Sequence, residues 1–205
     1  MNTRRKVFIQ LAVILLVVGS CSSTKLTTAW KDETYLYLPA KKLFVVGAFS
    51  DAGARRLFES MLVAQLAKQG TEAVASHIVF SGENIPDHEA VMSLMKERQC
   101  DFVLVTLFRG KKTAGATEIG TGVSTAPQDF SALWRDYYQH GYTAMPPRSQ
   151  EREIYGVETD LYETGEERPI WKSGGELVVN GPVADQYERF GELLVGKLRT
   201  DKMVR

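Results

Sequence analysis

Two stretches of the chain are apolar enough to form strands that are buried on both faces. Residues 43–49 read LFVVGAF, and residues 101–108 read DFVLVTLF. Continuous apolar runs of this length are typical of parallel strands that helices cover on both sides. A shorter strand is predicted over residues 71–76, which read TEAVAS. The first half of the chain therefore supplies three predicted strands.

Helical spacing of apolar residues separates these strands. Ser50 and Asp51 are good helix caps, and Gly70 ends the pattern that runs over residues 52–69. Pro86 and Asp87 open a second predicted helix. The apolar positions of the two helices are Ala54, Leu57, Met61, Leu62 and Leu66, then Val91, Leu94 and Met95. The order strand–helix–strand–helix–strand predicts a largely parallel sheet with right-handed crossovers.

The second half of the chain changes from helical to alternating spacing. Residues 154–163 alternate, and the turn at 164–167 leads into residues 169–179, which predicts an antiparallel hairpin. A final helix after residues 180–182 has one apolar stripe: Tyr187, Phe190, Leu194 and Leu198. Residues 109–128 are rich in glycine and threonine and predict a long loop or an irregular hairpin. We therefore expect one α/β domain over residues 41–201: βαβαβ, a β-hairpin and a C-terminal helix, with helices packed on a mixed sheet.

The amino terminus has the pattern of an export signal. Three cationic residues at positions 4–6 precede an apolar run over residues 7–18, and Gly19 and Ser20 are small. As a helix that run spans about 18 Å, which is short of the roughly 30 Å hydrocarbon core of a bilayer. Residues 1–20 are therefore predicted to be a signal peptide.

Cys21 follows this segment directly, and residues 18–21 (VGSC) resemble a bacterial lipobox. That resemblance implies cleavage before Cys21, diacylglycerol on its thiol and an acyl chain on the new amino terminus. Two or three acyl chains give stable membrane anchoring, whereas one is marginal. The alternatives are an ordinary secretory peptide with an incidental cysteine and an uncleaved anchor. Residues 21–40 are predicted to be a flexible tether with an average reach of roughly 25 Å.

Charge and cysteine usage narrow the classes of partner. Loss of residues 1–20 removes three positive charges and leaves 22 basic against 25 acidic residues. This balance argues against a nucleic-acid partner, which needs a basic surface. After lipidation of Cys21 only Cys100 remains, so the domain has no intramolecular disulfide. We expect Cys100 to be a small buried residue at the start of a strand.

A segment over residues 130–142 is rich in aromatic side chains that alternate with polar ones. Its aromatic members are Phe130, Trp134, Tyr137, Tyr138 and Tyr142. The segment is compatible with a core element, with a partner-binding patch or with glycan stacking. Mixed aromatic and polar character is typical of protein interfaces. The five aromatic residues are therefore our hypothesis for the partner-binding site.

Motifs for catalysis are missing from the sequence. It contains no GxSxG, HExxH, CxxC or GxGxxG pattern. The weak alternative is a metal site in which His77, Asp87 and His88 hold zinc at one end of the sheet. We therefore expect no catalytic residues, no metal and no cofactor apart from the covalent lipid on Cys21.

Short matches in a fixed order resemble a known family over most of the chain from Trp30 onward. They lie at residues 29–32 (AWKD), 42–47 (KLFVVG), 56, 58–59, 70, 73–76, 100–105 (CDFVLV), 160–165 (DLYETG) and 170–172 (IWK). The chain resembles small bacterial outer-membrane lipoproteins of unassigned function, whose α/β domain is similar to the amino-terminal domain of TolB and to the curli-secretion lipoprotein. This family has no known catalytic set, and its relatives serve in envelope assembly, secretion and scaffolding.

The resemblance implies a non-enzymatic, lipid-anchored periplasmic module that binds or scaffolds another component of the cell envelope. Ser22 and Ser23 follow the cysteine, and in Gram-negative sorting, as the resemblance implies, the absence of aspartate there favours the outer membrane. We expect the domain on its periplasmic face. A metal-dependent envelope hydrolase and a small-ligand-binding lipoprotein are the alternatives. The expected partners are the membrane and an envelope protein, and the sequence is also compatible with a homo-oligomer.

Overall fold

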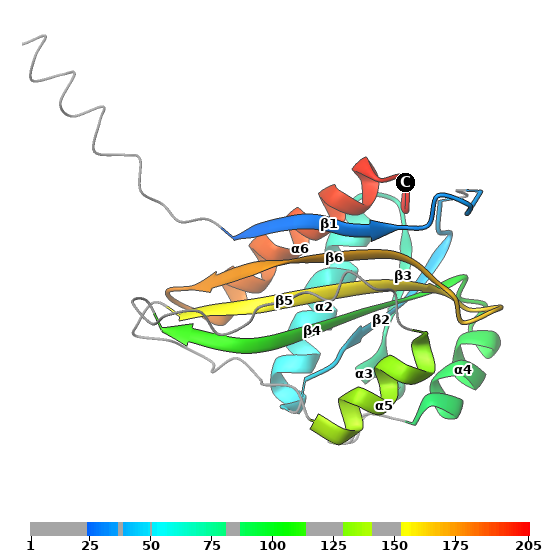
Figure 1. Cartoon of the computed structure of the whole chain (residues 1–205), viewed down its shortest axis with the longest axis horizontal. Helices are drawn as coiled ribbons and strands as arrows, with labels where there is room; N and C mark the ends of the chain where they lie inside the picture. The colour runs from blue at the N-terminus through cyan, green and yellow to red at the C-terminus, as the bar shows by residue number, and fades with distance from the viewer. Residues whose placement is uncertain (1–23, 37–38, 50, 81–86, 114–128, 141–152) are drawn as a thin grey trace, which may run out of the picture.

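A computed structural model of the chain describes residues 24–36, 39–49, 51–80, 87–113, 129–140 and 153–205. These residues form one six-stranded sheet in the order β1-β6-β5-β4-β2-β3, with helices packed on it (Figure 1). The elements are β1 (Lys25–Lys31), β2 (Lys42–Gly47), α2 (Ala52–Lys68), β3 (Glu72–Ala75), α3 (Ser76–Val79), α4 (His88–Glu97), β4 (Phe102–Thr113), α5 (Phe130–His140), β5 (Glu153–Glu163), β6 (Pro169–Val179) and α6 (Val183–Thr200). This arrangement confirms the predicted α/β fold with a mixed sheet, a hairpin and a C-terminal helix.

The direction of the strands gives the sheet two distinct ends. β2 is parallel to both β3 and β4, whereas β4, β5, β6 and β1 are antiparallel in succession. The carboxyl ends of β4 and β6 therefore lie at the end where β1 begins, as the arrows of Figure 1 show. We call this end the Lys25 end. The opposite end, where β4 starts, is the Asp101 end. β2 and β3 run in the same direction as β4, but β2 ends level with Thr106, midway along β4.

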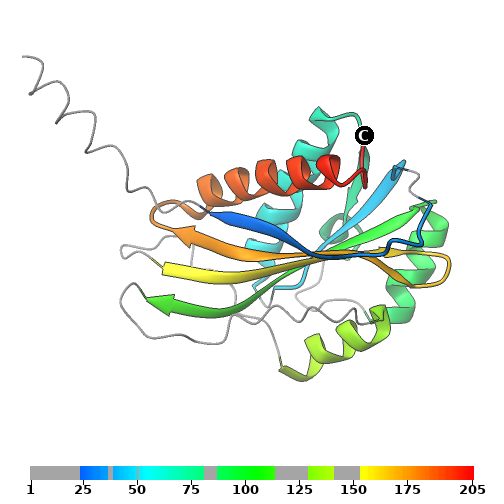
Figure 2. The same cartoon turned by 45° about the horizontal axis from the view of Figure 1, so that its top comes forward.

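Alternation along the buried strands assigns side chains to the two faces of the sheet. Leu43 and Val45 of β2 pack with α2 and α6, whereas Phe44 and Val46 pack with α4 and α5. Figure 2 shows α6 above the sheet and α5 below it. Because both faces are covered by helices, the central strands read as continuous apolar runs. Among the described residues, no helix has the length and apolar character needed to cross a membrane.

The predicted helix boundaries are formed by side-chain caps. The Asp51 carboxylate accepts a hydrogen bond from the Ala54 N–H at 2.6 Å, and the Asp87 carboxylate accepts one from the Ala90 N–H at 2.7 Å. Gly70 has a φ of +77°, which favours glycine, and the chain leaves α2 there. These contacts explain why the starts of α2 and α4 could be predicted from the sequence.

The predicted tether over residues 21–40 is wrong for Lys25–Lys31, because these residues form the edge strand β1. β1 pairs with β6 from Lys25↔Glu176 to Lys31↔Trp171, with an irregularity between Thr28 and Trp30. The Lys31 Nζ atom donates a hydrogen bond to the Asp201 carbonyl oxygen at 2.9 Å, which links β1 to the C-terminal end of the chain. The domain therefore includes β1, well before residue 41.

Gly175 of β6 allows β1 to lie this close. A Cβ atom built at Gly175 would stand 1.9 Å from the carbonyl oxygen of Lys25. We expect Gly175→Ala to displace β1 and to lower the free energy of unfolding by about 1–3 kcal/mol, as overpacking does. Hydrogen exchange of residues 25–31, together with urea unfolding, measures both effects.

Gly196→Ala is the matched control for this substitution. Gly196 lies inside α6 and is exposed, and a Cβ atom built there has open space around it. Alanine in a helix interior is expected to stabilise by about 0.5–1 kcal/mol relative to glycine. If residues 25–31 exchange their amide hydrogens as slowly in Gly175→Ala as in wild type, the close approach of β1 to Gly175 would be contradicted.

Candidate functional site

The predicted aromatic site is wrong for two of its five residues. Phe130 and Trp134 are buried and pack, with Leu133, against the sheet face that α4 also covers. They contact each other at 5.1 Å between ring centroids, and Phe130 lies 5.2 Å from the Tyr162 ring. Tyr137 and Tyr138 lie on α5, but their side chains, as well as Tyr142 and Cys21, are outside the described residues. Phe130 and Trp134 are core residues.

The structure places the three residues of the metal alternative in different environments. The His77 Nδ1 atom lies 2.8 Å from a Glu59 carboxylate oxygen, whereas the His88 Nε2 atom lies 2.6 Å from a Glu167 carboxylate oxygen. Asp87 caps α4. Within the described ranges, no group of three or more His, Cys, Asp or Glu side chains could hold a metal ion. His77, Asp87 and His88 therefore do not form the zinc site considered above.

A fully buried carboxylate organises the carboxyl ends of β2 and β3. Glu59 of α2 is 0% exposed. Its Oε1 atom accepts hydrogen bonds from the Gly47 N–H at 2.8 Å and the Ser76 hydroxyl at 2.6 Å. Its Oε2 atom accepts the His77 N–H at 2.8 Å and contacts His77 Nδ1. Carboxyl ends of parallel strands are where α/β folds commonly place ligand sites.

A second candidate site is a cleft of about 350 Å³ at the Asp101 end. It is lined by Tyr35, Pro39, Lys41, Asp101, Phe102, Glu163, Thr164 and Gly165. The Tyr35 ring meets the Phe102 ring edge-on at 6.1 Å, and the Arg168 guanidinium lies 5.6 Å from the Tyr35 ring centroid. Leu36, next to Tyr35, is 89% exposed. An aromatic wall with carboxylates and an exposed leucine is suited to contact with a partner.

Three buried charged side chains lie together on β5 and β6. Lys172 Nζ lies 2.5 Å from Glu158 Oε1 and 3.6 Å from Asp160 Oδ2. None of the three residues is more than 3% exposed. The Tyr162 hydroxyl donates to Asp160 at 3.3 Å. Two carboxylates share one ammonium group, and burial, opposed by Lys172 and reinforced by Glu158, raises the pKa of Asp160 to about 7.

This raised pKa predicts how stability depends on pH. An unfolded aspartate titrates near pH 4, so the folded state holds its proton more tightly between pH 4 and 7. The stabilising contribution of Asp160 is therefore complete below pH 4 and is lost as the pH rises to 7. Relative to Asp160→Asn, the wild-type chain should lose about 4 kcal/mol over this interval. Urea unfolding of both proteins at several pH values measures the difference, and parallel stability curves would contradict it.

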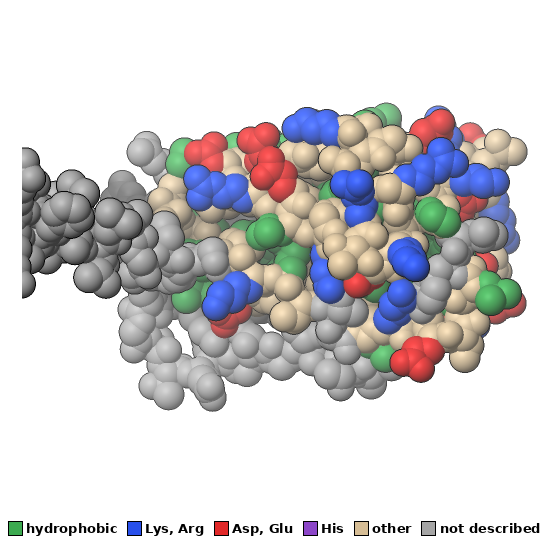
Figure 3. Space-filling model, turned by 90° about the horizontal axis from the view of Figure 1, so that it is seen from above, with side chains coloured by type: hydrophobic (Ala, Val, Ile, Leu, Met, Phe, Trp, Pro, Cys, Tyr) green, Lys and Arg blue, Asp and Glu red, His purple; other side chains and the backbone are tan. Residues whose placement is uncertain are grey.

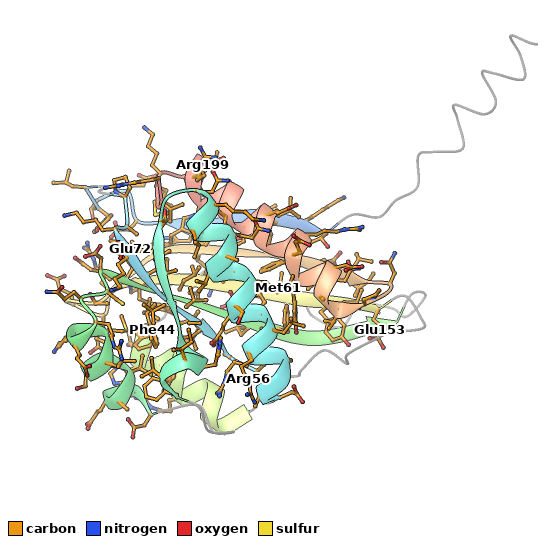
Figure 4. The ribbon with its side chains drawn as sticks, turned by 180° about the vertical axis from the view of Figure 1, so that it is seen from behind. Phe44, Arg56, Met61, Glu72, Glu153 and Arg199 are labelled. Carbon is orange, nitrogen blue, oxygen red and sulfur yellow. The ribbon has the colours of Figure 1, made fainter. Side chains whose placement is uncertain are left out.

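The face of the molecule that Figure 3 shows is mixed in charge. Figure 3, which shows the top of the molecule as it is oriented in Figure 1, has basic and acidic side chains interspersed. A hollow of about 430 Å³ between α2 and α6 is lined by Gln65, Lys68, Gln69, Glu192, Val195, Gly196 and Arg199. Figure 4 shows Arg199 near one end of this pair of helices and Arg56 near the other. Five of the seven lining residues are polar or charged, and no aromatic side chain lines the hollow.

Comparisons with known proteins give structural similarity only. No family model matches the chain, and no curated protein matches it. The fold is similar to the PelC dodecamer from Paraburkholderia phytofirmans, with a TM-score of 0.46 and 12% identity over 89% of this chain and 99% of that one. A second PelC dodecamer structure gives a TM-score of 0.48 with 11% identity, covering 83% of this chain and 95% of that one. Lipoprotein GNA1162 from Neisseria meningitidis gives 0.40 with 11% identity, covering 78% and 98%.

Proposed function

We propose that the chain is a lipid-anchored module of the cell envelope that holds its domain close to a membrane leaflet and presents the Asp101 end to another envelope component. The observation that carries the proposal is the start of β1 at Lys25, only four positions after Cys21. A fully extended chain spans at most about 14 Å over four residues. An acylated Cys21 therefore keeps the Lys25 end of the sheet near the leaflet.

The cleft lies at the other end of the molecule. β1 runs from the Lys25 end for about 20 Å, and Tyr35 follows it into the cleft. Tyr35, Phe102 and the exposed Leu36 then lie away from the anchor, in a position where a protein in the periplasm can reach them. We assign the partner contact to this cleft, in place of the α5 aromatics.

The anchor is tested on the full chain expressed from its own signal. Wild type should incorporate labelled palmitate and fractionate with the outer membrane, facing the periplasm. Cys21→Ser should incorporate no label and appear in the soluble periplasmic fraction. A wild-type chain that stays unlabelled, or that is soluble, would overturn the anchoring.

The partner surface is tested with a photo-crosslinking amino acid at Leu36 in the membrane-anchored chain. Leu193, on α6, is the matched control because it is also an exposed leucine, at 44%. Crosslinks should form at position 36 and be absent at 193. The mass of the product separates a second copy of this chain from a different envelope protein. Equal crosslinking at both positions, or none at 36, would remove the cleft as the contact surface.

A further inference from the structure

A serine, a histidine and a glutamate lie in line at the carboxyl ends of β2 and β3. The Ser60 Oγ atom of α2 lies 3.4 Å from His77 Nε2, and His77 Nδ1 lies 2.8 Å from Glu59 Oε2. A nucleophile within reach of a base, which a third group orients, is the arrangement of serine hydrolases on several unrelated folds. Such contacts are commonly somewhat long in the absence of a substrate.

The hydrogen bonds fix the imidazole in the orientation that catalysis requires. Glu59 is buried and its carboxylate accepts from Gly47, Ser76 and the His77 main chain, so it cannot rotate freely. An ionised carboxylate only accepts, and His77 Nδ1 therefore carries the proton that it donates to Glu59. This leaves the Nε2 lone pair facing the Ser60 hydroxyl. Glu59 is thus the positioning residue and His77 the base.

The same place offers access and a positive charge. Ser60 is exposed, and the His77 side chain is 13% exposed. Arg56 lies one helical turn before Ser60 on the same face of α2. Arg56, Arg55 and His77 line a small hollow of about 30 Å³, and Figure 4 places Arg56 near the amino end of α2. A guanidinium beside the base can stabilise an oxyanion that forms on an attacked carbonyl.

We propose that Ser60, His77 and Glu59 form a hydrolytic site for carboxylic esters. Ser60 Oγ bonds to the ester carbonyl carbon while its proton passes to His77 Nε2. The bond to the alcohol oxygen breaks, and His77 returns the proton to the departing alcohol. A water molecule then gives a proton to His77 while its oxygen bonds to the acyl carbon. The bond between that carbon and Ser60 Oγ breaks, and His77 returns the proton to Ser60 Oγ. The products are one carboxylic acid and one alcohol.

This activity goes beyond the proposed anchoring role and can be tested independently of it. The Ser60 site lies beyond the carboxyl ends of β2 and β3, at the sheet edge opposite β1. On a domain held close to a leaflet, the esters of lipids are a substrate that this site can meet. That last step rests on the proposed function. A soluble ester, p-nitrophenyl acetate, tests the site itself, and vesicles of a fluorogenic phospholipid ester test the lipid substrate.

The experiment uses the full chain purified from membranes in detergent. A fluorophosphonate should label Ser60, as located by peptide mass spectrometry. Hydrolysis of p-nitrophenyl acetate should fall at least 100-fold in Ser60→Ala and in His77→Gln. The rate should rise with pH along a single titration in wild type, and Glu59→Gln should shift that profile, an effect that a purely structural role for Glu59 would not produce.

Ser93→Ala is the matched control, because Ser93 is an exposed serine on α4. It should keep the full rate and the full labelling of Ser60. Circular dichroism of Ser60→Ala should match wild type, since an exposed hydroxyl is removed. Equal hydrolysis by wild type and Ser60→Ala, or labelling that misses Ser60, would overturn the site. Hydrolysis of the soluble ester without hydrolysis of vesicles would retain the site and remove only the lipid substrate.

Discussion

Replacing Glu59 with alanine is expected to lower the free energy of unfolding by about 3–5 kcal/mol, the range found when one member of a buried charged network is removed. The substitution leaves the Gly47 N–H, the Ser76 hydroxyl and the His77 N–H without their acceptor in the interior. A buried donor without a partner costs about 1–3 kcal/mol. Urea unfolding at neutral pH measures the change.

Two variants make this test specific. Glu59→Gln keeps one oxygen acceptor but turns an amide NH₂ toward a donor, either at Gly47 and Ser76 or at His77. It should therefore lose less stability than the alanine variant and more than a surface change. Glu188→Ala, an exposed position on α6, should stay within about 0.5 kcal/mol of wild type. An alanine variant at position 59 as stable as Glu188→Ala would show that the buried network does not hold β2, β3 and α2 together.

Lys172→Met is expected to cost a similar 3–5 kcal/mol at neutral pH. The methionine fills much of the lysine volume, but Glu158 and Asp160 lose the ammonium group that lies 2.5 and 3.6 Å away. Two carboxylates at most 3% exposed then remain near each other without this ammonium group. The loss should shrink on acidification, because protonation removes the buried charge. Thermal and urea unfolding at pH 5 and pH 7.5 give the comparison.

A triple variant separates charge from packing at the same place. Lys172→Met combined with Glu158→Gln and Asp160→Asn removes all three charges and keeps the side-chain volumes close to those of wild type. Replacing a whole buried ion cluster is often neutral or stabilising. The triple variant should therefore recover most of the stability that the single one loses. A triple variant as unstable as Lys172→Met would attribute the loss to packing.

The central sheet could be predicted because its strands are buried on both faces. The continuous apolar runs of β2 and β4 have few other placements in an α/β domain, and Asp51, Gly70 and Asp87 mark helix ends by local chemistry. Cys100 is buried as expected, and burial raises the pKa of its thiol. Local pattern and tertiary environment agree at these positions.

Edge elements and long-range polar contacts could not be predicted. β1 reads KLTTAWK, and its short mixed pattern becomes a strand only because β6 offers an edge with Gly175 in it. In α5, Phe130, Leu133 and Trp134 have helical i, i+3 and i+4 spacing, and Leu133 is the signal that indicates a buried stripe. Glu59 is separated from His77 by 18 positions, and no local pattern brings them together.

The proposed attachment through Cys21 and β1 would also determine how the domain bears mechanical load. If the leaflet pulls on residue 21 while a partner holds the opposite end of the sheet, the force runs along the strand axis. The backbone pairs from Lys25↔Glu176 to Lys31↔Trp171 would then be strained in shear, all at once, instead of opening one after another. Pulling in this direction should require more force than peeling β1 sideways from β6. A single edge strand would then resist mechanical unfolding along its own axis.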